Sequence, residues 1–178
     1  MNRRTLAAAA PLAAAAALTA AAPAGAAIVL DRGMAGVTLG TSDTAAIATL
    51  GSPTSGRAVR DRNGSLEVRR YFKGPKVKYV ATRPDPSDGD LTVTTFVTRR
   101  GSERTADGLG VGTAERTLKA KIPGLTCETR RLGGPPVREC FTKGRAVPDS
   151  EIGRDQTVFT ISRRTRLTTR VEISRFYD

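Results

Sequence analysis

The chain repeats one short stretch of its own sequence: Gly36-Val37-Thr38-Leu39-Gly40-Thr41-Ser42-Asp43 is followed 72 residues later by Gly108-Leu109-Gly110-Val111-Gly112-Thr113-Ala114-Glu115. The match continues to Leu50 and Ile122, with four identities and five conservative pairs over fifteen positions. A match at a fixed spacing indicates a structural unit that occurs more than once. We therefore predict two units, residues 27–104 and residues 105–178.

Each copy predicts the start of a short helix. Thr41 and Thr113 stand where N-cap residues are expected, because a side-chain oxygen there accepts an otherwise unpaired backbone N–H. Asp43 and Glu115 follow in the first turn, where the helix dipole favours negative charge. Apolar residues four apart share one helix face, and Gly and Pro end both helices. The apolar pairs are Ala46 with Leu50 and Leu118 with Ile122, and the breakers are Gly51-Ser52-Pro53 and Pro123-Gly124.

Strands and turns follow each predicted helix, with no further helical period. The last predicted strand, 166–174, alternates apolar and polar residues, which is typical of a sheet with one buried and one wet face. We predict an α+β fold of two tandem helix-plus-antiparallel-meander repeats, with the helices packed on one face of the sheet. The predicted strands are 57–61, 66–72, 77–82 and 91–98 in the first copy and 125–131, 137–142, 156–162 and 166–174 in the second.

The Gly-x-x-x-Gly-Thr-x-Asp/Glu start and the ending Leu50-Gly51-Ser52-Pro53 resemble two families of exported bacterial proteins. One is the β-lactamase-inhibitor protein family, a tandem helix-plus-four-strand repeat with hairpin disulfides; the other is the SmpA/OmlA-type outer-membrane assembly lipoprotein family, with a single related unit. The resemblance implies this fold and the binding of other proteins. The chain lacks the aromatic-rich concave face of the inhibitors and the lipidated cysteine of the lipoproteins.

The first 26 residues predict a cleaved signal peptide of the bacterial type. Arg3 and Arg4 precede an uncharged Ala/Leu run, Pro23 follows it, and Ala24-Gly25-Ala26 offers small residues to a signal peptidase. An alanine run inserts weakly into a bilayer, so a membrane anchor is the less favoured alternative, and no membrane span is expected after cleavage. We expect a secreted, extracytoplasmic protein that begins at Ala27 or Ile28, exported by either the general or the twin-arginine route.

Cys127 and Cys140 are the two cysteines of the chain, and an even count in an exported protein predicts a disulfide. Gly133-Gly134 lies midway between them and tolerates the positive φ angles of a tight hairpin turn. A turn centred there would place the two cysteines directly opposite each other. Pro135 lacks the N–H that closes such a turn, and Glu128 would face Glu139, so a longer loop stays possible.

The composition contains few of the residue types that commonly carry out catalysis. The chain has no histidine, which removes the commonest general base and transition-metal ligand. We therefore predict no metal, no cofactor and no catalytic residues, and a non-enzymatic protein. The alternative is a cell-envelope hydrolase that depends only on carboxylates, since two acids suffice for glycoside hydrolysis. The densest acidic cluster, residues 85–90, fits a turn better than a calcium loop, and residues 108–112 fit a turn better than a phosphate-binding loop.

Charge is the strongest surface feature. The chain carries a net charge of +12, of which Arg3 and Arg4 leave with the signal peptide, so the mature protein keeps +10. Such a charge attracts acidic partners. The alternative is that it only reflects a high content of arginine on ordinary solvated faces, with no role in binding. We predict a binding module for an acidic protein or an anionic envelope polymer. With only eight aromatic residues, nucleic acid is not an expected partner. The oligomeric state is left open, and the predicted binding residues on the wet sheet face are Arg69, Tyr71, Lys78, Arg166 and Arg170.

Overall fold

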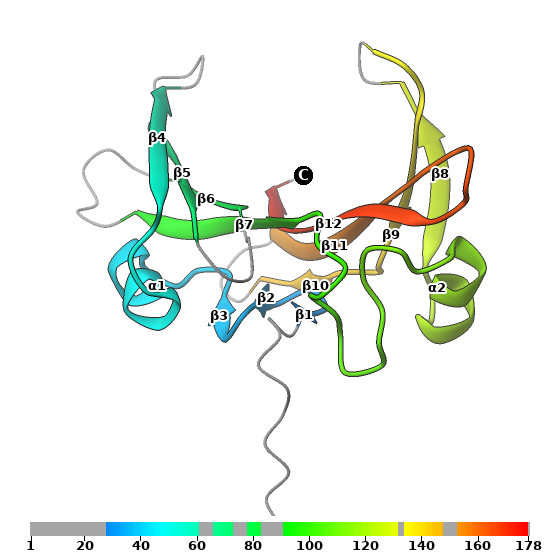
Figure 1. The fold of residues 1–178 in the computed structure, drawn as a ribbon, viewed down its shortest axis with the longest axis horizontal. Coiled ribbons are helices and arrows are strands. Elements are labelled where there is room, and N and C mark those ends of the chain that lie inside the picture. Colours follow the sequence, from blue (N-terminus) through cyan, green and yellow to red (C-terminus); the bar gives the residue numbers. More distant parts are fainter. Residues whose placement is uncertain are drawn as a thin grey trace, which may run out of the picture.

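The computed structural model describes residues 28–60, 66–72, 78–82, 91–131, 134–147 and 153–177. The predicted signal peptide, Gly133 and the acidic cluster 85–90 lie outside these residues. The described part of the chain is mostly β, with twelve strands and two short helices (Figure 1). The elements are β1 (Ile28–Val29), β2 (Gly33–Met34), β3 (Val37–Thr38), α1 (Asp43–Leu50), β4 (Ser55–Arg60), β5 (Leu66–Tyr71), β6 (Lys78–Thr82), β7 (Thr92–Thr98), α2 (Glu115–Lys121), β8 (Thr126–Arg130), β9 (Val137–Phe141), β10 (Arg145–Ala146), β11 (Gly153–Ile161) and β12 (Thr168–Tyr177).

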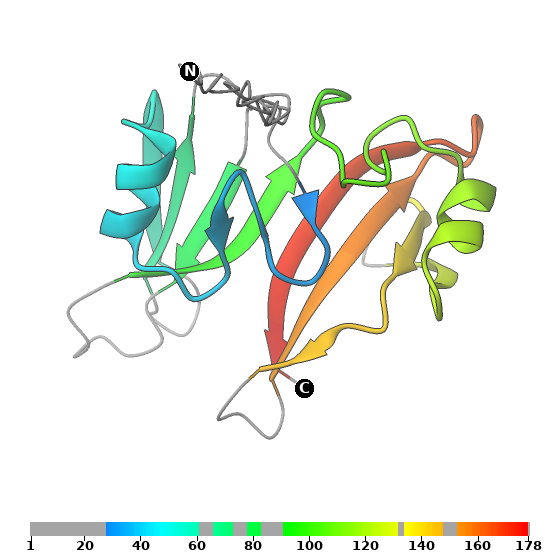
Figure 2. The same ribbon diagram turned by 90° about the horizontal axis from the view of Figure 1, so that it is seen from below.

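One antiparallel sheet of nine strands dominates the structure, in the order β4-β5-β6-β7-β12-β11-β9-β8, with β10 paired to β11. The sheet is strongly curved, so that β4 and β8 at its two ends rise on the same side of the central strands (Figure 1). A second sheet holds three very short strands, β1 to β3. Seen from below, α1 and α2 lie at opposite ends of the molecule, with β2 and β3 between them (Figure 2).

The predicted fold class is wrong. The helices contain only eight and seven residues, and helices this short add little stability of their own. The long strands form one continuous sheet beside a small three-stranded one, rather than two separate helix-plus-meander repeats with helices packed on one face. Two separate meanders would leave the backbone groups of β7 and β12 unpaired at their edges. Instead Ile173 pairs with Phe96 and Val171 with Thr98, which joins all the long strands into one sheet.

The individual strands agree with the pattern from which they were predicted. All eight predicted strands are present, each within a few residues of its expected bounds, as β4 to β9, β11 and β12. Residues 28–38 were not predicted as strands and form the small sheet, because two-residue strands carry no readable alternation. None of the helices in the described part of the chain has the length and apolar character needed to cross a bilayer.

The helix starts differ from the prediction by one residue. Ser42 is the N-cap of α1, where its Oγ accepts a hydrogen bond from the Ala45 N–H at 3.2 Å. Ala114 is the N-cap of α2 and makes no side-chain cap. Thr113 instead closes the preceding turn, since its Oγ1 accepts the Gly110 N–H at 3.0 Å. Gly108 and Gly112 have φ angles of 77° and 90°, so residues 108–112 form the predicted turn into the second helix.

The disulfide between Cys127 and Cys140 is confirmed, with a Cα–Cα distance of 4.0 Å. The two cysteines are directly paired across β8 and β9, and Glu128 faces Glu139 as the hairpin predicted. Cys140 is part of a core cluster to which both helices, the small sheet and the central strands contribute. The members of that cluster that are no more than 2% exposed are Ile28, Met34, Val37, Ala46, Val93, Phe96, Leu109, Leu118, Cys140, Phe159, Ile161, Val171 and Ile173.

Candidate functional site

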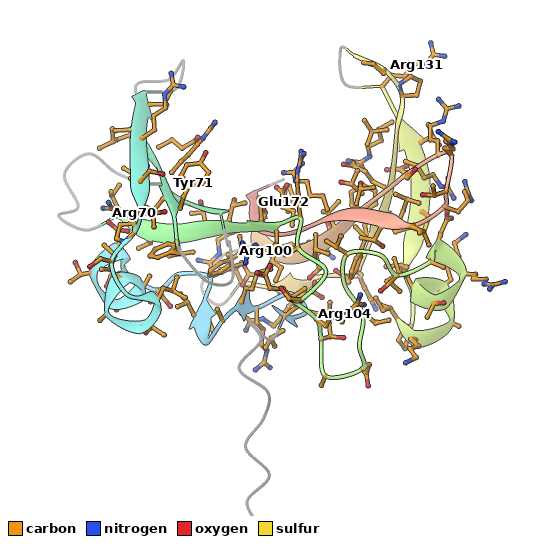
Figure 3. All side chains as sticks on the ribbon, viewed as in Figure 1. Arg70, Tyr71, Arg100, Arg104, Arg131 and Glu172 are labelled. Carbon is orange, nitrogen blue, oxygen red and sulfur yellow. A yellow bond between two sulfur atoms is a disulfide. The ribbon has the colours of Figure 1, made fainter. Side chains whose placement is uncertain are left out.

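Strand alternation assigns the polar residues of the large sheet to the face opposite the core. Val171 and Ile173 on β12 are fully buried, so their neighbours Arg170 and Glu172 point the other way. Figure 3 shows Tyr71 and Glu172 on the side to which β4 and β8 rise, whereas Arg70 is directed toward α1. We call this side the open face. Its principal side chains are Arg57, Glu67, Arg69, Tyr71, Arg170, Glu172, Phe176, Arg154, Phe141, Glu128 and Arg130.

Two of the five predicted binding residues, Arg69 and Tyr71, lie together at one end of this face. Arg69 and Tyr71 alternate on β5, and Tyr71 is paired across the strands with Lys78. The Lys78 side chain lies outside the described part, so its position is known only from the backbone register. Tyr71 is 41% exposed. Arg57 on β4 stands directly opposite Arg69, and two like charges in that position cost stability rather than adding to it.

The other two predicted residues do not join this group. Arg170 lies on the same face but on β12, with β6 and β7 between it and β5. Arg166 is not on the sheet at all, because β12 begins at Thr168 and Arg166 occupies the preceding turn with φ 58°. Its guanidinium lies 2.7 Å from a carboxylate oxygen of Glu115 at the start of α2. The five residues therefore do not form one cluster.

Much of the positive charge on the open face is neutralised locally. Three arginines form ion pairs with a glutamate two residues away on the same strand, on the same side of the sheet. An acidic ligand at these positions would have to compete with a neighbouring carboxylate. Net charge alone therefore does not locate a site. The pairs are Glu67 with Arg69, Glu128 with Arg130 and Glu172 with Arg170.

A pocket of about 360 Å³ at the β8 end of the open face is different. Its lining contains three cations, two phenylalanines and an amide, and no carboxylate. Within the described part of the chain, neither Lys143 nor Arg154 forms an ion pair. Phe176 is 39% exposed although it is a large apolar side chain. The lining residues are Arg130, Phe141, Lys143, Arg154, Gln156 and Phe176.

Arg130 is held in a defined position in this pocket. Its guanidinium carbon lies 4.2 Å from the centre of the Phe141 ring, in cation–π geometry. Its Nε donates to a carboxylate oxygen of Glu128. The two terminal nitrogens have no further partner among the described residues. They are therefore available to a carboxylate or phosphate, which an arginine binds with two parallel hydrogen bonds.

Sequence reasoning missed this pocket for a simple reason. The last strand was predicted to end at residue 174, but β12 continues to Tyr177. Extending the alternation by one step would have placed Phe176 on the wet face with Arg170 and Glu172. The positions of Lys143 and Arg154 depend on the pairing of β10 with β11, which no local pattern indicates.

The buried acids of the structure serve ion pairs rather than an open catalytic site. Asp43 on α1 accepts from Arg70 at 2.7 Å. Asp155, which is fully buried, accepts from Arg175 at 2.8 Å and from Arg145 at 3.0 Å. Glu115 contacts Arg138 at 2.7 Å and Lys119 at 3.3 Å, in addition to Arg166. The hydrogen bond from Arg138 holds the pKa of Glu115 below its ordinary value.

A second groove, of about 500 Å³, lies beside α2. Lys119 and Arg166, two of the cations in its lining, are already paired with Glu115. Glu115 also lies within 4.8 Å of Cys127 and Cys140, measured between possible metal-ligand atoms. Because the two sulfurs are bonded to each other and the carboxylate is paired with cations, these three residues do not form a metal site in this structure.

Glu103 is the exception among the buried acids. It is 0% exposed and accepts a hydrogen bond from Thr98, but its Oε1 has no partner among the described residues. Burial raises the pKa of this carboxyl above its ordinary value, against the opposing effects of Thr98 and Arg100. Such a group is neutral more often than an exposed glutamate.

We expect the stability of the protein to fall as the pH rises past the ordinary pKa of Glu103. The folded state binds the proton of the Glu103 carboxyl more tightly than the unfolded state does. The stabilisation that this proton provides is therefore fully present below the unfolded pKa, and it is lost as the pH rises through the folded pKa. The free energy of unfolding of Glu103→Gln, measured with urea across the same pH range, should not fall in this way. Glu128→Gln changes an exposed carboxylate and is the control. Equal pH profiles for Glu103→Gln and wild type would contradict the assignment.

Comparison with known proteins identifies no family. No protein-family model and no curated protein matches the chain. Among solved structures, a cysteine-rich secretory protein from Staphylococcus aureus subsp. aureus Mu50 is similar at 9% sequence identity and a TM-score of 0.43. The match covers 76% of this chain and 44% of that chain, so this chain spans less than half the length of that protein. A likeness of this degree bears on neither function nor partner.

Proposed function

We propose that the protein is a secreted, non-catalytic binding module whose open face holds an acidic protein or an anionic envelope polymer. The pocket formed by Arg130, Phe141, Lys143, Arg154 and Phe176 is the observation that carries this proposal. Its lining combines three cations with no carboxylate, and two of these cations, Lys143 and Arg154, form no ion pair within the described part of the chain. Only Arg130 is paired, with Glu128, so an anion that enters the pocket meets positive charge from Lys143 and Arg154 that no described carboxylate neutralises.

Two further features support binding on this face. Arg57 and Arg69 stand opposite each other at the far end of the sheet, a repulsive arrangement that an anionic ligand would relieve. Tyr71 on β5 and Phe176 on the central strand β12 are exposed aromatic residues of the same face, and exposed aromatics beside arginines are typical of binding hot spots. The disulfide of Cys127 and Cys140 supports an oxidising, extracytoplasmic location.

The proposal predicts that partners are captured through the pocket in a salt-dependent manner. The mature protein, immobilised, should retain acidic material from the extracytoplasmic fraction of the producing cells at low ionic strength. Added salt should release that material, because exposed charges are screened within about 10 Å at 0.1 M salt. The triple variant Arg130→Glu, Lys143→Glu and Arg154→Glu should retain none of it.

The matched control reverses Arg116, Arg163 and Arg164, three exposed arginines on α2 and in the turn before β12. It changes the net charge by the same amount as the pocket variant but leaves the pocket intact. Equal loss in the control would show that net charge acts without a site. Retention of every partner by the pocket variant would refute the proposal, and turnover of a wall substrate abolished by one carboxylate substitution would favour a hydrolase.

A further inference from the structure

We infer that the pocket recognises a protein segment in which a carboxylate side chain stands beside an apolar side chain. This inference rests on the proposed function and chooses between its two kinds of partner. It draws on the position of Arg130 and the size of the pocket, which suit a single anionic group, and on the exposure of Phe176, which favours a peptide over an anionic polymer without apolar side chains, such as one of phosphate and polyol units.

Arg130 is arranged in advance for a planar anion. The guanidinium of Arg130 packs on the Phe141 ring in a cation–π contact. Its Nε–H donates a hydrogen bond to Glu128. These two contacts fix the direction of the terminal nitrogens, so little side-chain freedom is lost when an anion binds. A carboxylate matches the two terminal nitrogens with two parallel hydrogen bonds. Lys143 and Arg154 supply further charge without such a directional requirement.

Phe176 gives the pocket an apolar contact that a simple anion does not use. Its ring is 39% exposed, and it lines the same hollow as Arg154, its partner across β11 and β12. Covering an aromatic ring with an apolar side chain removes apolar surface from water, which favours binding. A chain of phosphate and polyol units has no group that would do this. The ring therefore favours a peptide partner.

The volume of the pocket agrees with a ligand of this size. About 360 Å³ is near the lower end of the range for small-molecule sites. One acidic side chain together with part of an apolar neighbour would occupy it. The lining residues belong to the open face, which lies on the side of the sheet to which β4 and β8 rise (Figure 1).

Three small probes test the inference on the mature, disulfide-bonded protein. The blocked peptides acetyl-Glu-Phe-Glu-amide and acetyl-Glu-Ser-Glu-amide have the same charge and differ in one apolar side chain, and glycerol 1-phosphate carries charge without an apolar group. Binding is followed by NMR shifts of the backbone amides of Phe141 and Phe176. We expect the Phe peptide to bind about tenfold more tightly than the Ser peptide, and glycerol 1-phosphate to bind no better than the Ser peptide.

Phe176→Ala should remove the advantage of the Phe peptide, and Phe176→Leu should keep most of it. The control is Leu167→Ala, which removes an apolar side chain of equal exposure from the groove beside α2. Equal binding of the two peptides, an advantage that survives Phe176→Ala, or preferred binding of glycerol 1-phosphate would overturn the inference but leave anion binding in place. If no probe shifts either residue, the proposed function of the pocket fails as well.

Discussion

Replacing Glu115 with Gln is expected to reduce the free energy of unfolding by about 3–5 kcal/mol at neutral pH, the cost of breaking a buried ion pair from one side. Glu115 is 3% exposed and contacts Arg138 at 2.7 Å. Arg138 retains little access to water, and its Nε is already without a partner among the described residues. Loss of the carboxylate charge leaves that guanidinium uncompensated. Urea or thermal unfolding of the variant measures the effect.

The loss of stability in Glu115→Gln should depend on pH, and it should be smaller in acid than at neutral pH. The folded pKa of Glu115 is depressed, so its stabilisation is present above the ordinary value of 4.5 and disappears as the pH falls through the folded pKa. The wild-type and variant proteins should therefore approach each other in acid. Lys119→Met breaks only the exposed part of the network and should cost less than about 1 kcal/mol.

A double variant separates the charge from the packing. Glu115→Leu combined with Arg138→Met replaces the buried pair with apolar groups and should recover most of the stability that the single variant loses. If Glu115→Gln unfolds at the same denaturant concentration as wild type at neutral pH, the ion pair does not stabilise the start of α2. A difference that persists unchanged in acid would show that charge is not its cause.

Removing the disulfide should reduce stability by about 3 kcal/mol in the chain-entropy model. Cys127 and Cys140 are separated by 13 residues, and β8 is the last strand of the sheet, paired only with β9. The bond therefore ties an edge strand to the sheet. The variant Cys127→Ala with Cys140→Ala should unfold at lower urea concentration, and hydrogen exchange should accelerate first in the amides of β8.

Chemical reduction of the wild type provides the control for this prediction. It breaks the bond without changing the side-chain volume, so it should reproduce most of the loss of stability seen in the double variant. A reduced protein with an unchanged urea midpoint would contradict the prediction. Faster exchange spread evenly over β4 to β7 would show that the bond does not act locally on β8.

Local patterns predicted the elements of this protein well but not their assembly. The alternation in residues 166–174 and the turn signals between strands located eight strands, since alternation depends only on which side of a strand is buried. The pairing of Ile173 with Phe96 joins strands that are far apart in sequence, and no local pattern records it. The strength of the sequence repeat favoured an α+β class, although the helices in it are too short to define the fold.

In the candidate site, too, local features were predicted from the sequence and the assembly of strands was not. Arg69 and Tyr71 were placed correctly on one face, because β5 alternates regularly. Arg166 was misplaced, since the positive φ angle of this residue ends the alternation and turns its side chain toward Glu115. The pocket combines residues of β8, β9, β11 and β12 with Lys143, and so it exists only after the strands have assembled. Its cations carried no distinguishing signal in a chain with 29 basic residues.

The central claim, that the pocket is an anion-binding site, is tested most directly by titrating labelled poly-L-glutamate with the purified mature protein and following fluorescence anisotropy. We predict saturable binding that weakens steeply as salt is raised. The triple variant Arg130→Glu, Lys143→Glu and Arg154→Glu should lose binding by more than tenfold, whereas the variant with Arg116, Arg163 and Arg164 reversed should bind nearly as well as wild type. Equal affinities for the two variants would contradict the account.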